Sequence, residues 1–444
     1  MERETKQTSD FRYDTSATRV PWAAVGENVN AEDMLRVIRF LVGPQTPDDP
    51  TYASRLEKVG KALQALFKVG KPAGKLTLGD RVKELEAWAA GYLGAKHACF
   101  LTNATAGFEI AYKFAGLRPG DEVICPAITF IATIAYPLSI GARVVFADVD
   151  PRTINMDPAD VARKITARTR VIIPVHIGGY PVDMAPIVEL ARPRGITVIE
   201  DAAHAFGAIY RGRKVGTLGD FGAFSFHEVK NTTSLGEGGL LVSDLEVGAQ
   251  FAQARFLGVD PSRQIPDWLY DVVALPGVHG GVFAAGNHSA TEVQAVALMS
   301  QLERLDAIIA ARRQAAEYLN RRFSAVEGMV APPLDSADTK STHHLYLFQV
   351  DPERAGGDIQ ALKQKLAARG VTQIAHFAPL YEFELLRQMG YSTEEGRRLC
   401  PNAEEVFRHR FTHLPLYGLT QEQVSYLADA VIESVREMRG GRTN

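Results

Sequence analysis

The chain has 444 residues, 46% hydrophobic and 23% charged, so it is long enough for more than one domain with a sizeable core. A formal net charge of -3 gives no reason to expect nucleic acid or an anionic membrane as a partner. The three cysteines are far apart and have no CxxC spacing, which argues against a disulfide framework and a metal site and favours a reducing cytoplasm.

The N-terminal region reads as a polar start followed by helices. Its first residues carry mixed charge and no apolar run, so we expect no signal peptide. Asn30 precedes an amphipathic stretch with acids in its first turn, which predicts a capped helix. Further helices are expected over 52–68 and 81–93. We treat residues 1–77 as an N-terminal extension.

From about residue 95 short apolar runs alternate with helix-length segments. Strands are expected at 99–101, 122–125, 143–146, 171–175, 197–200, 222–226 and 239–243. Strands that are apolar throughout, joined by helices, predict a mostly parallel sheet of an α/β protein covered on both faces. Ligands bind beyond the carboxyl ends of such strands. The longest apolar window, 129–146, contains Pro137, Gly141 and Arg143 and is too interrupted for a membrane span.

A long amphipathic helix is expected over 291–322, leading into a smaller second domain. In that domain we expect a strand over 344–350, a helix over 358–369, a strand over 372–376 and a final helix over 420–438.

The stretch around Lys230 is the best candidate for chemistry. An apolar run ending Phe224-Ser-Phe-His-Glu-Val leads to the lysine, and Gly236, Gly238 and Gly239 follow it. Glycines permit tight turns and close approach to a bound group. A lysine in a partly dry pocket has a lowered pKa and can act as an amine nucleophile, as in Schiff bases with pyridoxal phosphate. A structural loop lysine is the alternative.

Other polar residues lie where the expected strands end, and each has an ordinary structural interpretation as well. Asp201 is either a helix cap or the partner of a pyridinium nitrogen. The turn at 102–107 is either a plain strand–helix turn or a phosphate cradle, for which Ser225 is a second ligand. Phe130 is either core or a stacking ring. Asn287, His376 and His176 read first as a cap and two hydrogen-bonded histidines.

Three motifs together carry a resemblance to a known family. Glu200-Asp-Ala-Ala-His-Ala205, Phe224-Ser-Phe-His-Glu-Val-Lys-Asn231 and Gly236-Glu-Gly-Gly239 occur in the order found in the DegT/DnrJ/EryC1/StrS sugar aminotransferases. The chain resembles this family from about residue 78 to 435. The resemblance implies fold type I, with a large cofactor domain (78–306) built on a seven-stranded, mostly parallel sheet and a small α+β domain (307–444).

The resemblance also implies roles for particular residues. Lys230 matches the lysine that binds pyridoxal phosphate and moves the proton. Asp201 matches the acid on the ring nitrogen, and Phe130 the stacking ring. Ala104, Thr105 and Ser225 match the phosphate ligands. Asn287 matches an asparagine that reaches the cofactor of the neighbouring subunit, which implies a homodimer with shared active sites.

Several positions depart from the family pattern. Ala104 stands where glycine is usual; an alanine still offers its amide if its φ is negative. His204 stands in the cofactor site where glutamine is commonest, and histidine there resembles the aminohydroxybenzoate synthases. His288, Ser289 and Ala290 replace the usual Tyr-Arg-Met. The spacing of His227 and Lys230 is typical of the nucleotide-sugar branch. We take His227 and His376 as candidate substrate-binding residues.

These features predict a cytoplasmic aminotransferase with pyridoxal 5'-phosphate as cofactor and pyridoxamine phosphate as intermediate. It would move an amino group from L-glutamate or L-glutamine to a nucleotide-linked keto-deoxysugar. Two alternatives stay open. One is a keto-cyclitol aminotransferase or a dehydratase like the aminohydroxybenzoate synthases. The other is a non-catalytic binding protein that keeps the fold. No metal, nucleic acid or membrane partner is expected.

Overall fold

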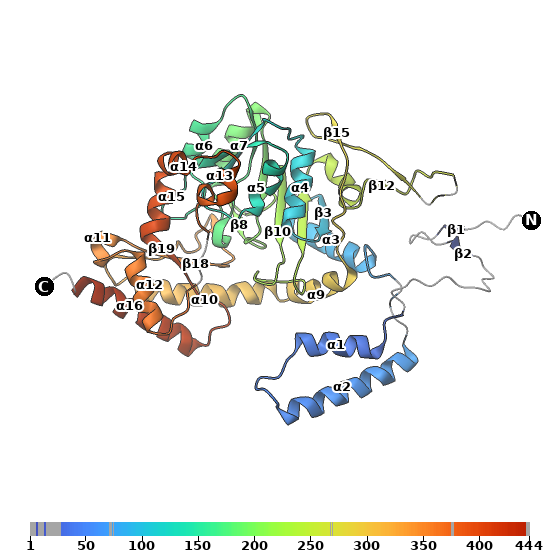
Figure 1. Cartoon of the computed structure of the whole chain (residues 1–444), viewed down its shortest axis with the longest axis horizontal. Coiled ribbons are helices and arrows are strands. Elements are labelled where there is room, and N and C mark those ends of the chain that lie inside the picture. Colours follow the sequence, from blue (N-terminus) through green and yellow to red (C-terminus); the bar gives the residue numbers. More distant parts are fainter. Residues whose placement is uncertain are drawn as a thin grey trace, which may run out of the picture. The chain divides into compact units, whose positions relative to one another are not determined.

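The computed structural model describes residues 28–440, except 71, 72, 74, 267, 269 and 374–376, and the backbone of two short strands near the N-terminus. It divides into two compact units, Met1–Lys83 with Thr291–Val293, and Glu84–Ala290 with Gln294–Asn444 (Figure 1). Most of the predicted strand over 372–376, including His376, lies outside the described residues.

The first unit contains β1 (Lys6–Gln7) paired with β2 (Tyr13–Asp14), and the helices α1 (Ala31–Leu41) and α2 (Pro50–Val69). The predicted cap is confirmed, because the Asn30 side chain accepts hydrogen bonds from the backbone of Glu32 and Asp33. Gly60 lets α2 approach α1, since a Cβ there would lie 3.0 Å from the side chain of Leu35. Helix α3 (Asp80–Leu93) starts in this unit.

The second unit is built on a seven-stranded sheet, as predicted. Its strands are β3 (His97–Leu101), β4 (Glu122–Pro126), β5 (Arg143–Ala147), β6 (Thr169–Ile172), β7 (Thr197–Asp201), β10 (Phe221–Ser225) and β11 (Gly239–Ser243). Their order is β3-β11-β10-β7-β6-β4-β5. Strand β11 runs antiparallel to both of its neighbours, and the strands from β10 to β5 are parallel.

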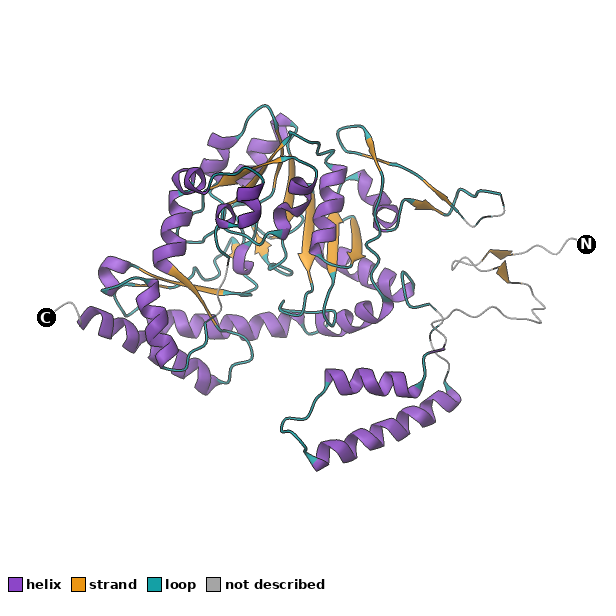
Figure 2. Cartoon of the chain, viewed as in Figure 1, coloured by secondary structure: helices purple, strands orange, loops and turns teal. Residues whose placement is uncertain are grey.

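Helices flank this sheet (Figure 2). They are α4 (Ala104–Phe114), α5 (Ala132–Ser139), α6 (Pro158–Lys164), α7 (Met184–Ala191) and α8 (Phe251–Arg255). Helix α4 packs on β10 and β11, where Phe114 meets Phe221 and Phe251 in a buried aromatic cluster. Burial of such large apolar side chains is the main stabilising contribution to the core.

Among the described residues of this unit, three small sheets lie outside both the central sheet and the C-terminal one. Strands β8 (Ile209–Tyr210), β9 (Arg213–Lys214) and β17 (Thr339–Lys340) form one, β12 (Val259–Asp260) pairs with β13 (Asp271–Val272), and β14 (Leu275–Pro276) pairs with β15 (Val282–Phe283).

The long helix predicted over 291–322 is two helices, α9 (Glu292–Leu302) and α10 (Leu305–Phe323). The expectation of one continuous helix is therefore wrong. A two-residue turn separates them, and Arg304 has φ −107° and ψ 7°, outside the helical region. The apolar spacing continues across this turn, with Leu302 and Leu305 both buried, so periodicity did not mark the break.

The C-terminal part forms its own core. Strands β16 (Met329–Val330), β18 (Tyr346–Val350) and β19 (Phe411–Leu414) make an antiparallel sheet. Its helices are α11 (Pro352–Ala355), α12 (Ile359–Ala368), α13 (Glu384–Gln388), α14 (Thr393–Leu399), α15 (Pro401–Glu405) and α16 (Gln421–Gly440). Phe323, Phe348 and Val431 belong to its buried cluster. The domain boundaries after residues 77 and 306 stay predictions.

None of the helices described is both long and apolar enough to cross a membrane. Within the same residues there is no group of three or more histidine, cysteine or acidic side chains placed to hold a metal ion.

Candidate functional site

Lys230 lies in the turn that joins β10 to β11. Backbone hydrogen bonds order this turn: Phe226 donates to Gly238, Glu228 to Gly236, and Lys230 to His227, at 2.7, 2.8 and 2.9 Å. Gly236 has φ +129°, a conformation that side chains rarely adopt. The predicted glycine-rich turn is therefore present, and it fixes the backbone of the lysine.

Burial lowers the pKa of the Lys230 amine to about 8, although the nearby Asp201 carboxyl acts in the opposite direction. An amine with this pKa is partly neutral at physiological pH, and only the neutral amine is a nucleophile. The lowered pKa agrees with the prediction from the sequence, and the role of Lys230 as a nucleophile stays a prediction.

Asp201 ends β7, the parallel neighbour of β10, and is buried. Its carboxylate accepts a hydrogen bond of 2.7 Å from Thr133 Oγ1 and one of 3.1 Å from the backbone N–H of Ala203. Burial raises the pKa of Asp201, while these hydrogen bonds and the charge of Lys230 lower it. The acid and the lysine therefore lie close enough to influence each other's ionisation.

A turn suited to a phosphate lies beside them at the start of α4. Asn103 caps the helix by accepting from the N–H of Ala106 at 2.9 Å, and Ala104 and Thr105 are its first residues. The N–H groups of a first turn have no partner within the helix and favour an anion. Ala104 has a negative φ, so the condition set for alanine at this position is met.

Ser225 lies one strand from this turn. In the sheet register Ser225 pairs with Gly239, and Gly239 pairs with Leu101, two residues before the cap. A Cβ on Gly239 would overlap the carbonyl carbon of Asn103 and lie 2.6 Å from the nitrogen of Ala104. Glycine is thus required where β11 passes behind the helix start.

The side chains of the remaining predicted site residues make no hydrogen bond to Lys230 or Asp201 among the contacts described. Phe130 follows β4 and is 61% exposed. His227 Nε2 lies 3.7 Å from Glu237 Oε1 in the lysine turn. Asn287 is exposed and accepts a hydrogen bond from the backbone of Ser289 at 3.1 Å. His376 is outside the described residues.

His204 is half-buried, three residues after Asp201. Its Nδ1 accepts from the N–H of Gly178 at 3.3 Å, and its ring packs against the rings of His344 and Phe377. His176, interpreted as a hydrogen-bonded histidine, is confirmed as one: it is fully buried and bonds to Glu200 at 3.1 Å and to the N–H of Val182 at 3.0 Å.

Sequence reasoning missed three residues at this site. Thr133 donates to Asp201, and Asn231 and His344 hydrogen-bond to each other at 3.0 Å beside the lysine turn. Thr133 is the second residue of α5, three residues after Phe130, and no local pattern in the sequence marks it as a partner of Asp201. Asn231 directly follows Lys230, and this adjacency could have marked it as a candidate. His344 is far away in sequence, and only the fold brings it next to Asn231.

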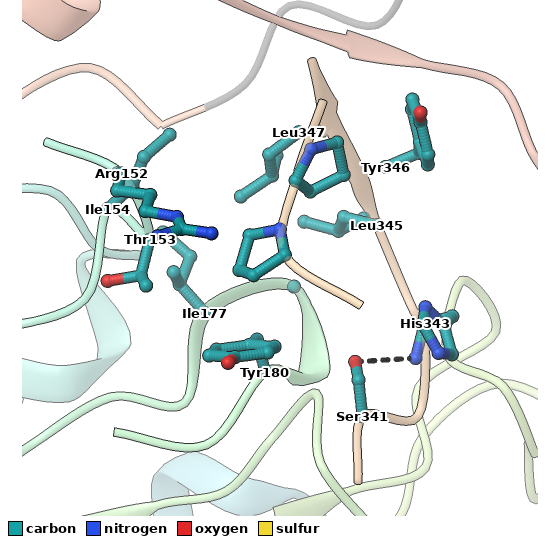
Figure 3. Close-up of a pocket in the computed structure, with 13 residues that line it drawn as sticks. Arg152, Thr153, Ile154, Ile177, Tyr180, Ser341, His343, Leu345, Tyr346 and Leu347 are labelled. Carbon is teal, nitrogen blue, oxygen red and sulfur yellow. Dashed lines mark hydrogen bonds between the residues drawn. The ribbon is translucent and has the colours of Figure 1, made fainter. Parts of the chain in front are cut away.

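A small cavity of about 30 Å³ lies beside the segment that contains His344 (Figure 3). Figure 3 shows Ile177, Tyr180 and Leu345 around it, with Ser341 hydrogen-bonded to His343. It has room for only about one or two water molecules, so it is too small for a substrate.

The residues fit pyridoxal phosphate in three respects. A half-buried lysine has a lowered pKa, and a buried acid ends the strand adjacent to β10. The register of β10 and β11 brings the helix start, which only a glycine lets β11 approach, to the same edge of the sheet. These are the groups that a Schiff base, a pyridine nitrogen and a phosphate each require.

Comparison with known proteins also indicates an aminotransferase. The model of the DegT/DnrJ/EryC1/StrS aminotransferase family matches residues 58–432. The spore coat polysaccharide biosynthesis protein SpsC of Bacillus subtilis is 34% identical over 383 residues, covering 83% of this chain and 92% of that protein. GDP-perosamine synthase of Caulobacter vibrioides is 35% identical over 306 residues, covering 69% and 78%.

Solved structures share the fold. Protein Spr1654 of Streptococcus pneumoniae in its PMP form superposes with a TM-score of 0.74 at 26% identity, covering 90% of this chain and 100% of that chain. The aminotransferase TlmJ of Streptoalloteichus hindustanus has a TM-score of 0.72 at 30% identity, covering 85% and 96%. The predicted fold type I is confirmed, and the chain belongs to the DegT/DnrJ/EryC1/StrS aminotransferase family.

Proposed function

We propose that this aminotransferase uses pyridoxal phosphate to move an amino group from L-glutamate or L-glutamine to the keto group of a nucleotide-linked keto-deoxysugar. The observation that carries the proposal is the pairing of the half-buried Lys230 with the buried Asp201 near the first turn of α4. The relatives support the class of acceptor, because one is a GDP-perosamine synthase and another acts in polysaccharide biosynthesis.

Each part of the cofactor has a candidate partner. Asp201 would accept a hydrogen bond from the protonated ring nitrogen, and Thr133 would hold the carboxylate in place. The first N–H groups of α4, at Ala104 and Thr105, and the hydroxyl of Ser225 would bind the phosphate. Phe130 would cover one face of the ring, which accounts for an exposed phenylalanine at the end of a strand.

When bound, pyridoxal phosphate supplies an electron-withdrawing ring that takes up the charge left on the donor carbon. Asp201 would stay ionised as long as it faces the cationic nitrogen, which opposes the effect of its burial. Lys230 would first bind the cofactor through Nζ. As a free amine, Nζ would take the proton from the donor carbon and pass it to the cofactor.

One observation favours a second class of acceptor substrate. His204 lies three residues after Asp201, and its ring packs against those of His344 and Phe377. The 3-amino-5-hydroxybenzoate synthase of Amycolatopsis mediterranei is 34% identical over 331 residues, covering 74% of this chain and 82% of that protein. A keto-cyclitol aminotransferase or a related dehydratase is therefore the second candidate. We propose His227 and His376 as substrate contacts.

We further propose that the protein is a cytoplasmic homodimer with shared sites, in which Asn287 binds the phosphate in the partner's site. Asn287 is exposed, and Val229 and Leu235 in the lysine turn are exposed apolar residues. A second copy would cover such side chains.

The experiment is a pair of spectra and a pair of assays. The purified protein, loaded with pyridoxal phosphate, should show a visible band of the lysine-bound cofactor. L-glutamate or L-glutamine should convert this band to that of pyridoxamine phosphate, and the active donor is thereby identified. Nucleotide ketosugars and keto-cyclitols are then supplied as acceptors to the aminated protein.

Return of the visible band with a nucleotide ketosugar supports the proposal. Return only with a keto-cyclitol supports the second candidate. Lys230→Ala should remove the band and all turnover, and a fully active Lys230→Ala protein would contradict the proposal.

A further inference from the structure

The segment Ser341–His344, between β17 and β18, carries four polar residues that are all buried. Buried polar groups are costly unless they are hydrogen-bonded, so their partners show what the segment holds together. Ser341 Oγ donates to the carbonyl of Gly179 at 3.1 Å, and the N–H of Thr342 donates to the same carbonyl at 3.1 Å. The segment is thus fixed to the loop after β6.

Asn231 joins this segment to the lysine turn through both ends of its amide. Its Nδ2 donates to the carbonyl of Thr342 at 3.0 Å, and its Oδ1 lies 3.0 Å from Nδ1 of His344. A carbonyl can only accept, which settles the orientation of the amide. Nδ1 of His344 is therefore the donor in the second hydrogen bond.

His344 in turn contacts the turn that follows Asp201. Its ring centroid lies 4.6 Å from that of His204, and Thr342 Oγ1 donates to the carbonyl of His204 at 2.6 Å. Since Nδ1 of His204 accepts from the N–H of Gly178, the proton of a neutral His204 ring is on Nε2. The contacts fix the ring of His204 in place and determine its tautomer.

Arg312 supports the same segment from α10. It is buried, and its guanidinium donates to the carbonyls of His343 and His344 at 3.5 and 3.3 Å, while its other face stacks on Tyr417. The backbone at His344 is thus held from one side by Arg312, and its side chain bonds to Asn231 on the other.

We propose that Asn231 and His344 are positioning residues, which hold the Lys230 turn and the His204 ring in one fixed arrangement. This inference rests on the proposed function. Neither residue need touch the substrate: Asn231 acts through the backbone of Lys230, and His344 acts through the ring of His204. Two elements that approach the cofactor from different strands are linked in this way by a segment of the C-terminal part.

The chain offers a matched control for a merely structural role. Asn320 also joins two segments through its amide, accepting from Tyr346 Oη at 2.6 Å and donating to the carbonyl of Pro332 at 2.8 Å. It belongs to the C-terminal core and has no hydrogen bond to the lysine turn among the described residues. Asn320→Ala should lower the melting temperature without changing the visible band of the bound cofactor or its pH midpoint.

The first test follows the pH titration of the visible band in the loaded protein, for Asn231→Ala, Asn231→Asp, His344→Ala and Asn320→Ala. The midpoint of this titration reports the proton on the nitrogen that joins Lys230 to the cofactor. Asn231→Asp adds a negative charge at the residue that directly follows Lys230, so its midpoint should rise by roughly half a pH unit. The alanine variants at 231 and 344 should shift the midpoint and lower kcat about tenfold.

The second test distinguishes the hydrogen bond of His344 from its bulk. His344→Asn keeps an N–H donor near the position of Nδ1, whereas His344→Gln places its amide near Nε2. His344→Asn should therefore retain most of the activity and the wild-type midpoint, and His344→Gln should not. Because both variants are polar and of similar size, this comparison holds even if His344→Ala does not fold.

The outcomes separate the inference from the proposed function. If the wild type forms the visible band and is aminated, but the Asn231 and His344 variants match Asn320→Ala in midpoint and kcat, the positioning role is wrong. Equal loss in His344→Asn and His344→Gln also overturns it. If the wild type itself forms no band with pyridoxal phosphate, the proposed function fails and this inference fails with it.

Discussion

At the scale of the residue, burial and charge have opposite effects on the pKa values of Lys230 and Asp201. Lys230 and Asp201 attract each other, which by itself would keep both ionised. Burial has the larger effect on each, since the pKa of the lysine is lowered and that of the acid is raised. Both shifts are towards the neutral forms. The lowered pKa of the amine supports the proposed role of Lys230 as a nucleophile, and a cationic partner would oppose the effect of burial on Asp201.

The lowered pKa of Lys230 predicts a dependence of stability on pH. In the unfolded chain the amine titrates near its ordinary value of 10.5, and in the folded chain near 8. Between these values the unfolded state binds more protons, so the contribution of Lys230 to folding is unfavourable below pH 8 and is relieved as the pH rises through this range. Lys230→Met should therefore stabilise the cofactor-free protein by up to about 3 kcal/mol at pH 7.

The measurement is urea unfolding of the cofactor-free wild type and variant at pH 7 and near pH 10.5. The gain in the free energy of unfolding should almost disappear at the higher pH. Lys58→Met, at an exposed position on α2, is the control and should show no such dependence. A gain from Lys230→Met that is equal at both pH values would show that packing, and not the buried charge, is responsible.

At the scale of the element, the turn from β10 to β11 needs two glycines, Gly236 and Gly239, each for a different reason. Gly236 supplies a positive φ, whereas Gly239 supplies space for the start of α4. The second requirement is the stricter one, because the atoms in the way belong to the backbone that would bind the phosphate.

Gly239→Ala should therefore displace the first turn of α4, weaken pyridoxal phosphate binding at least about tenfold and destabilise the protein by roughly 1–3 kcal/mol. The checks are a fluorescence titration with the cofactor and thermal unfolding. Gly91→Ala in α3 is the matched control, because a Cβ there meets nothing within 4 Å. That variant should be neutral or stabilising by up to about 1 kcal/mol. Unchanged cofactor affinity in Gly239→Ala would refute the close approach.

The sequence predicted the strands of the central sheet well, because each is an apolar run bounded by turn residues. It could not give the direction of β11, since a buried antiparallel strand such as 239–243 has the same composition as a parallel one. It placed Lys230 and Asp201 by motif. It missed the bond between Asn231 and His344, because two residues that far apart in sequence carry no local pattern that joins them.

At the scale of the whole molecule, the proposed homodimer determines whether one chain contains a complete site. In the proposed site, Lys230, Asp201 and the first turn of α4 all belong to one chain. Asn287 is exposed on the same unit, and its side chain accepts only a local hydrogen bond from Ser289 among the contacts described. The dimer proposal assigns its free amide donors to the partner's phosphate.

Complementation between subunits tests this proposal. Lys230→Ala and Asn287→Asp should each be nearly inactive, the second because its carboxylate repels the phosphate. In a heterodimer of the two, one site would carry both substitutions and the other would carry neither. Heterodimers made by co-expression with two affinity tags should therefore regain about half of the wild-type activity.

The matched control pairs Lys230→Ala with Asp201→Asn, two residues proposed to act in the site of their own chain. Each site of that heterodimer keeps one defect, so no activity should return. If Lys230→Ala with Asn287→Asp also stays inactive, Asn287 acts within its own chain or not at all. If the tagged chains do not associate, the protein is not a dimer. Recovery with Asn287→Asp and none with Asp201→Asn is the one combination that requires a site built from two subunits.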